Sequence, residues 1–161
     1  MQNAKDSFYM ALRTRLTATN PERTILLRGA VRPGIVMEEA EATFSQPPAD
    51  VFVLRWVATG VDLDLPSMMT GLQCEVQYST SGTQSFGGLD RGRALSRMDQ
   101  ELLAILQPFS TAKMNYSATP PAKMLTQVFW DEPVFSPITI QRERLSRTAM
   151  VMVYGYEEPG E

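Results

Sequence analysis

The feature that most constrains this chain is the run Ala49–Ala58, ADVFVLRWVA, in which strand-forming residues follow one another almost without a polar break. Successive side chains of a β-strand point to opposite faces of the sheet. Apart from Arg55, both faces here are apolar: one holds Val51, Val53 and Val57, and the other Phe52, Leu54 and Trp56. A strand of this kind must be covered on both sides, so the rest of the chain, or a partner, has to supply two covers.

Two amphipathic helices are predicted as covers. Phe8, Leu12 and Leu16 recur every four residues, and this helix should end before Asn20-Pro21 because the residue preceding proline is disfavoured in the α conformation. Asp90 begins a second helix that ends at Pro108. Its apolar stripe consists of Leu95, Met98, Leu102, Ile105 and Leu106.

Further strands complete the predicted sheet. Leu72–Ser79 alternates strictly between apolar and polar residues, as a half-buried antiparallel strand does. Thr24–Arg28, Met124–Trp130 and Arg147–Tyr156 also have strand character, and the last is apolar on both faces. We therefore predict one α+β domain over residues 1–161, with a four- to five-stranded, mostly antiparallel sheet, two helices packed on one face and a frayed tail at about 157–161.

Composition disfavours several classes of function. The net charge of -3 and the lack of a long basic run disfavour duplex binding and sequence-specific recognition of nucleic acid. The chain has no histidine, which removes imidazole-based catalysis and zinc binding. A single cysteine, Cys74, cannot form an internal disulfide and suits a cytoplasm. Because no apolar run has the length of a signal core or a membrane span, we expect neither secretion nor membrane insertion.

Two stretches have some of the features of binding sites. The acidic residues Glu38, Glu39 and Glu41 lack the alternate spacing and turn glycine of a calcium loop, so a solvated loop is the favoured interpretation. The Gly-rich segment 79–92 precedes a helix and is followed by Arg93 and Arg97, but it has no Gly-Lys-Ser/Thr ending. An ordinary loop is favoured there over a phosphate site. No catalytic residue, metal or cofactor is predicted.

The apolar surface of the sheet exceeds what two helices on one face can cover. Either the loop Gly29–Pro48 folds over the second face, or a neighbouring subunit does. Large exposed apolar areas usually mark interaction sites. We therefore expect a homo-oligomer.

The order of elements resembles the small tail terminator, or tail-completion, proteins of tailed bacteriophages and prophages. The resemblance rests on a leading amphipathic helix, a proline-introduced strand (PPADVFVLRW), an alternating strand (LQCEVQYST), a helix (DRGRALSRMDQELLAIL) and a closing strand (TAMVMVYGYE). It implies a structural protein without catalysis that forms a ring, expected to be a hexamer, at the end of the tail tube. Such a ring stops tube polymerisation, joins the tube to the head connector and lets DNA pass unread. The expected location is the virion or the bacterial host cytoplasm.

The resemblance further implies contacts along the exposed sheet face and through loops at 38–44, 79–88 and 131–140. The residues expected at interfaces are Trp56, Met68, Met69, Phe86, Glu38, Glu39, Glu41, Val134 and Phe135.

A different class of function stays open at this point, namely a small ligand-binding domain or an enzyme with a carboxylate-lined pocket. Its candidate acids are Asp62, Asp64, Glu75, Asp131 and Glu132, and its candidate donors are Tyr78 and Tyr116. A generic interaction subunit outside phages is a third possibility.

Overall fold

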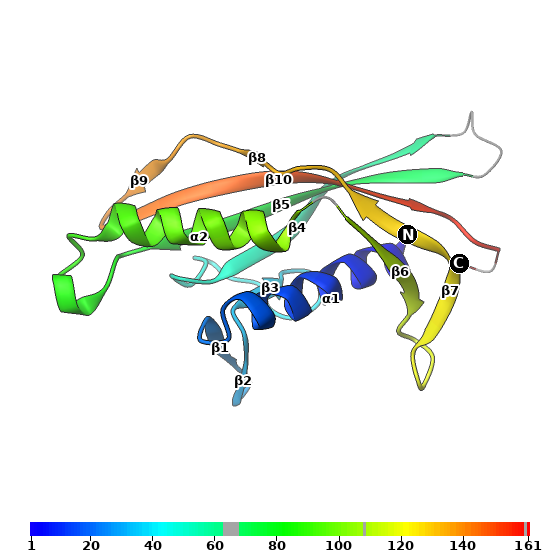
Figure 1. Ribbon diagram of the computed structural model, residues 1–161, viewed down its shortest axis with the longest axis horizontal. Helices are drawn as coiled ribbons and strands as arrows, with labels where there is room; N and C mark the ends of the chain where they lie inside the picture. Colours follow the sequence, from blue (N-terminus) through cyan, green and yellow to red (C-terminus); the bar gives the residue numbers. More distant parts are fainter. Residues whose placement is uncertain (63–67, 108, 160) are drawn as a thin grey trace.

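The chain folds as two helices against a large curled sheet, in a computed structural model that describes residues 1–62, 68–107, 109–159 and 161 (Figure 1). The helices are α1 (Gln2–Thr19) and α2 (Arg91–Ile105), and a short 3-10 turn, η1, spans Gln84–Phe86. The strands are β1 (Thr24–Leu27), β2 (Ala30–Pro33), β3 (Ile35–Met37), β4 (Phe52–Asp62), β5 (Met69–Thr80), β6 (Phe109–Asn115), β7 (Ala122–Trp130), β8 (Val134–Phe135), β9 (Thr139–Gln141) and β10 (Arg144–Tyr156).

The main sheet has eight strands in the order β3-β4-β5-β10-β7-β6, with β8 and β9 also paired to β10. One edge of β10 pairs along its whole length with β5, while the other edge is shared by β9, β8 and β7. β3 runs parallel to β4, and the other pairs are antiparallel. β1 and β2 form a separate two-stranded hairpin.

The α+β class and the two helices agree with the prediction, but the predicted four- to five-stranded, mostly antiparallel sheet is wrong. β8 and β9 have two and three residues and lie in the proline-containing segment 131–145, where the sequence has no strand-length pattern. They are strands because β10 offers them an unpaired edge. The segment between α2 and β7 likewise supplies β6, which the sequence did not predict.

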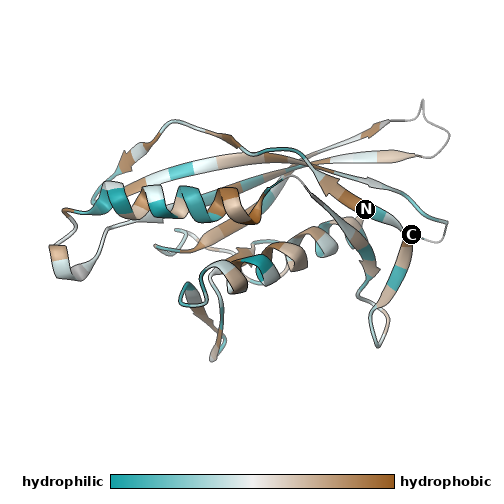
Figure 2. Cartoon of the chain, viewed as in Figure 1, coloured by the Kyte–Doolittle hydropathy of each residue, from teal (hydrophilic) through white to brown (hydrophobic). Residues whose placement is uncertain are grey.

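The helices pack on one face of the sheet, and Figure 1 shows the sheet bending around α1 toward β6 and β7. Phe8, Leu12 and Leu16 of α1 are fully buried, as are Leu102 and Ile105 of α2. Both helices carry hydrophilic and hydrophobic residues side by side (Figure 2), as amphipathic covers do. The predicted stripes therefore form the main core together with the inward residues of the central strands.

β4, which contains most of the apolar run Ala49–Ala58, is buried on both faces only near its start. Phe52, Leu54 and Trp56 enter the main core, as the alternation predicts. Val53 faces the other way into a small second core with Val36 and Val51. Ile25, Leu27 and Phe44 pack against that second core, so the hairpin and the loop after β3 supply the second cover locally. Beyond the bulge at Val57, no such cover lies on the second face of β4 in the part of the chain that the structure describes, and Val57 is 42% exposed.

The predicted helix cap at Asp90 forms differently. α2 does begin after Asp90, but the carboxylate makes no capping bond within the helix. Instead it accepts hydrogen bonds from the backbone N–H of Thr83 (2.9 Å) and from the Thr83 hydroxyl (3.0 Å). The backbone bond from Thr83 is the main reason that the pKa of Asp90 lies below its usual value. The side chain closes the loop that precedes the helix.

Candidate interaction surfaces

Of the residues expected at interfaces, several are taken up by the fold. Trp56 is 9% exposed and packs in the main core, where its ring meets Phe8 edge-on at 5.8 Å between centroids. Phe135 is half-buried against the same core. Trp56 is therefore a core residue of the subunit, whereas Phe135 lies at the edge of the core.

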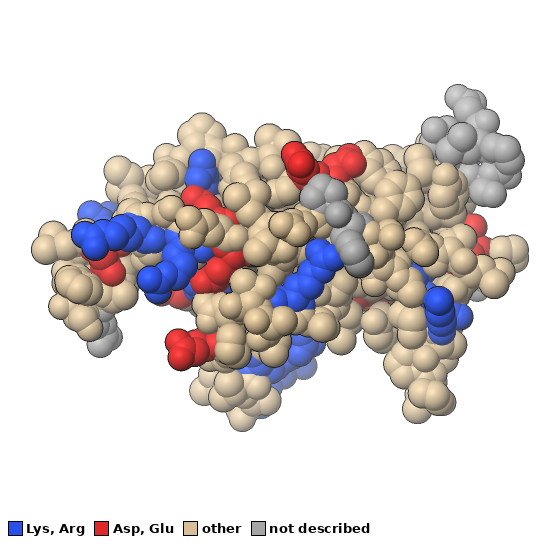
Figure 3. Space-filling view, viewed as in Figure 1, with Lys and Arg blue, Asp and Glu red and all other residues tan. Residues whose placement is uncertain are grey.

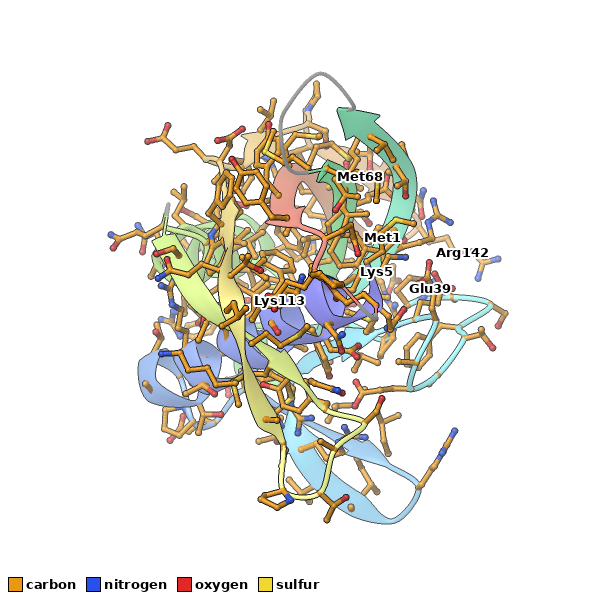
Figure 4. All side chains as sticks on the ribbon, turned by 90° about the vertical axis from the view of Figure 1, so that its right-hand side faces the viewer. Met1, Lys5, Glu39, Met68, Lys113 and Arg142 are labelled. Atoms are coloured by element: carbon orange, nitrogen blue, oxygen red, sulfur yellow. The ribbon has the colours of Figure 1, made fainter. Side chains whose placement is uncertain are left out.

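Glu41 is also an internal group, although the acidic run to which it belongs is predicted to be a solvated loop. Its carboxylate accepts hydrogen bonds from the Tyr9 hydroxyl and from Arg32, and Arg13 lies 3.8 Å away. This pairing ties the turn after β3 to α1. Glu39 is exposed, and its carboxylate lies 3.7 Å from the ammonium group of Lys5, as Figure 4 shows by their neighbouring positions. Glu38 is half-buried.

The remaining expected residues lie at the surface but at separate places. Phe86 lies in η1, and Val134 lies in β8, 70% exposed. Met68 precedes β5 and is labelled at the top of Figure 4, with half-buried Met69 next to it. They do not form one patch, so contacts through all of them would involve several sides of the molecule.

Exposed aliphatic residues that the sequence analysis did not single out are Leu26, Val31, Leu89, Leu125 and Ile140. Together with Phe86 and Val134 they make seven large apolar side chains, each at least 62% exposed, among the described residues. Leu26 and Val31 are direct partners across the β1–β2 hairpin. The signal for this pair was present in the strand TILL, which is apolar at every position after Thr24.

The sheet face opposite the helices combines polar and apolar rows. β5 contributes Gln73, Glu75 and Gln77, and β10 contributes Met150, Met152 and Tyr154. Phe129 of β7 stacks on Tyr154 with centroids 5.3 Å apart. The Tyr154 hydroxyl donates a hydrogen bond to Asp131 (2.8 Å), which is the main reason that the pKa of Tyr154 is raised. The β10 row is half-exposed, so this face remains available for contact.

Among the described residues, the acids and donors of the enzyme hypothesis do not converge. Glu75 pairs with Arg55 at 3.0 Å on the sheet face, while Asp131 and Glu132 follow β7. The side chain of Asp62 and the whole of Asp64 lie outside the described residues. Tyr116 is exposed and lies in the turn after β6.

Tyr78, the other proposed donor, is committed to a structural network. Its buried hydroxyl donates to Asp99, which also accepts from Arg147. Burial, followed by the hydrogen bond to Asp99, raises the pKa of Tyr78 far above its usual value. This phenol therefore stays protonated.

A pocket of about 220 Å³, lined mainly by residues with polar side chains, lies beside β5 and β10. Its lining includes Gln77, Ser79, Ser146 and Thr148, and Arg144 donates to the carbonyl of Pro47 (3.0 Å) at its rim. No aspartate or glutamate lines it. Its chemistry thus differs from the carboxylate-lined pocket that the enzyme hypothesis requires.

The Gly-rich loop after β5 does not present a phosphate cradle. The N–H of Thr83 is bound by the Asp90 carboxylate, and the N–H of Gly82 by the Thr80 hydroxyl (3.1 Å). Arg91 is turned to the carbonyl of Glu143 (2.9 Å). An internal carboxylate thus occupies donors that a phosphate would need.

The C-terminal residues are held in place rather than frayed. Glu158 accepts hydrogen bonds from the backbone N–H groups of Leu125 (3.0 Å) and Thr126 (2.8 Å). Lys113, labelled in Figure 4, is 1% exposed and donates to the carbonyl of Tyr156 (2.6 Å) and to the Glu161 carboxylate. The segment therefore ties β6 and β7 to the end of β10.

No protein-family model and no curated protein matches the chain. Within the described ranges, neither helix is long and apolar enough to cross a bilayer. In the same part of the chain, no three side chains of the metal-binding types come together as a metal site.

Proposed function

We propose that this protein is a non-enzymatic assembly subunit that, like the tail terminators it resembles, forms a ring at the end of a phage or prophage tail tube. In that role it stops tube polymerisation and joins the tube to the head connector. It acts in the virion and in the host cytoplasm, binds neither membrane nor a specific nucleic-acid sequence, and needs no cofactor.

The observation that carries this proposal is the distribution of exposed apolar side chains over separate projections. The β1–β2 hairpin holds Leu26 and Val31, the loop before α2 holds Phe86 and Leu89, and β7 holds Leu125. A single patch favours a two-fold dimer, whereas different patches favour head-to-tail contacts and further partners. A ring subunit contacts two neighbours, and a terminator also contacts the structures above and below it.

Native mass spectrometry of the purified chain over a concentration series tests the proposal. We expect a closed species of about six copies that persists on dilution, because ring closure adds contacts without leaving free ends. A strict monomer at every concentration would overturn the proposal.

A small-ligand protein is the second candidate, and the observation in its favour is the 220 Å³ pocket that carries Arg144 and several hydroxyl groups. This function predicts a monomer whose Arg144→Gln variant loses ligand-induced shifts in NMR spectra. The exposed apolar side chains give it no support, so the assembly role is preferred.

A further inference from the structure

The β1–β2 hairpin is apolar on both of its faces. Ile25 and Leu27 on one face pack against the second core. Leu26 and Val31 form a cross-strand pair on the other face, and they are 68% and 71% exposed. A two-stranded hairpin is marginally stable by itself in water, and an exposed aliphatic pair adds nothing unless something covers it. The outer face therefore suits a contact.

Arginines lie at and around this hairpin, and the exposed carboxylate of Glu22 lies just before it. Arg28 at its turn is exposed and donates only to a carbonyl, that of Glu41 (3.2 Å), among the bonds of the described residues. Arg13 and Arg32 share the single carboxylate of Glu41. Figure 3 shows basic side chains low in the view beside the base of the hairpin, with an acidic side chain close to them. The matching surface should be apolar and acidic.

A groove of that chemistry lies where α2 ends beside the connection from β7 to β8. It has a volume of about 430 Å³, and its apolar lining includes Leu103, Ala104, Leu106 and Pro133. Leu103 is 47% exposed there. Glu132 is the only charged residue among those that line the groove, and it forms no ion pair within the described residues.

We propose that the hairpin of one copy inserts Leu26 and Val31 into this groove of a second copy, with Arg28 facing Glu132. The inference rests on the proposed function, since it specifies how the ring subunits contact one another. The hairpin projects at the bottom of Figure 1, while the β7–β8 connection lies near the top. Because the two surfaces differ, the contact is head-to-tail and leaves a free hairpin and a free groove until a ring closes.

Cross-linking tests the contact in the full-length chain. Leu26→Cys and Ala104→Cys are combined in one variant and treated with a short bismaleimide. The native Cys74 is fully buried and does not compete. We expect a ladder of covalently joined copies. The matched control combines Ala104→Cys with Leu125→Cys, since Leu125 is 93% exposed but lies on β7. A ladder of equal strength in the control, or none in the test variant while the wild type assembles, would overturn the contact.

A charge exchange provides the second test. Residue 28 has a positive φ of 50°, which aspartate tolerates, so Arg28→Asp is preferred to a longer acid. We expect Arg28→Asp and Glu132→Arg each to weaken assembly about tenfold or more, and the double variant to restore it. Both positions are exposed, so unchanged circular dichroism serves as the folding control.

The outcomes separate this inference from the function on which it rests. If neither charge variant weakens assembly, or if the double variant does not restore it, the hairpin contact is overturned. The proposal that the protein forms a ring then still stands. A wild-type chain that is monomeric at all concentrations overturns both.

Discussion

At the scale of the residue, the side chain of Trp56 has a well-packed ring but a buried Nε1–H group without a hydrogen-bond partner among the described residues. The indole ring packs beside Phe8, and the Lys5 ammonium lies 5.3 Å from its centroid. The ring therefore stabilises the core while its N–H carries a desolvation cost.

This separation predicts different costs for two substitutions. Trp56→Ala should lower the free energy of unfolding by about 3–5 kcal/mol, because it leaves a large cavity. Trp56→Phe should cost less than Trp56→Ala, because it keeps an aromatic ring, leaves a smaller cavity and removes the unpaired N–H. Urea denaturation of the two variants measures both values. A loss for Trp56→Phe as large as that for Trp56→Ala would contradict this separation.

At the scale of the element, the carboxylates of Glu158 and Glu161 hold the C-terminal segment against β6 and β7. We call this arrangement the clip. The pKa of Glu158 is lowered, mainly by the hydrogen bond from the Thr126 hydroxyl. For Glu161, burial acts to raise the pKa, but the hydrogen bond from Lys113 and further bonds outweigh it and leave the pKa lowered. Both groups thus stabilise the folded state when ionised.

The clip should therefore open in acid. A carboxyl group whose pKa is lowered by folding stabilises the protein above its unfolded pKa, near 4.5 here, and loses that effect as the pH falls through the folded value. We expect the amides of Leu125 and Thr126 to lose hydrogen-exchange protection below about pH 4.5, after correction for intrinsic rates. The amide of Val151 in the core serves as the control. Protection of Leu125 and Thr126 that is unchanged in acid would contradict the clip.

At the scale of the whole molecule, assembly and stability should be linked. A contact that forms only between folded copies raises the thermal midpoint as protein concentration rises. We expect the wild-type midpoint to increase between about 1 µM and 100 µM, and the Arg28→Asp midpoint to change less, in calorimetric scans. A wild-type midpoint that does not depend on concentration would argue against self-association. The predicted single domain should give one cooperative transition in each scan.

Much of the local structure could be predicted because it depends on periodicity. Leu72, Cys74, Val76 and Tyr78 alternate in the sequence and are all buried in β5. The apolar stripes of both helices were likewise correct. The candidate surfaces were less predictable, since Val134 was identified whereas Leu26, Val31 and the groove beside Glu132 were not.

The sequence by itself determined which residues form the two helices and the long strands other than β6, and that Ala49–Ala58 needs two covers. Only the tertiary structure decided what the covers are: helices on one face, and Phe44 with the hairpin over the start of the other. The tertiary structure also decided that residues 134–135 and 139–141 form strands. It likewise decided that Glu41 forms an internal ion pair. The physical reason is that periodicity acts between near neighbours, whereas strand pairing and charge pairing depend on groups that only folding brings together.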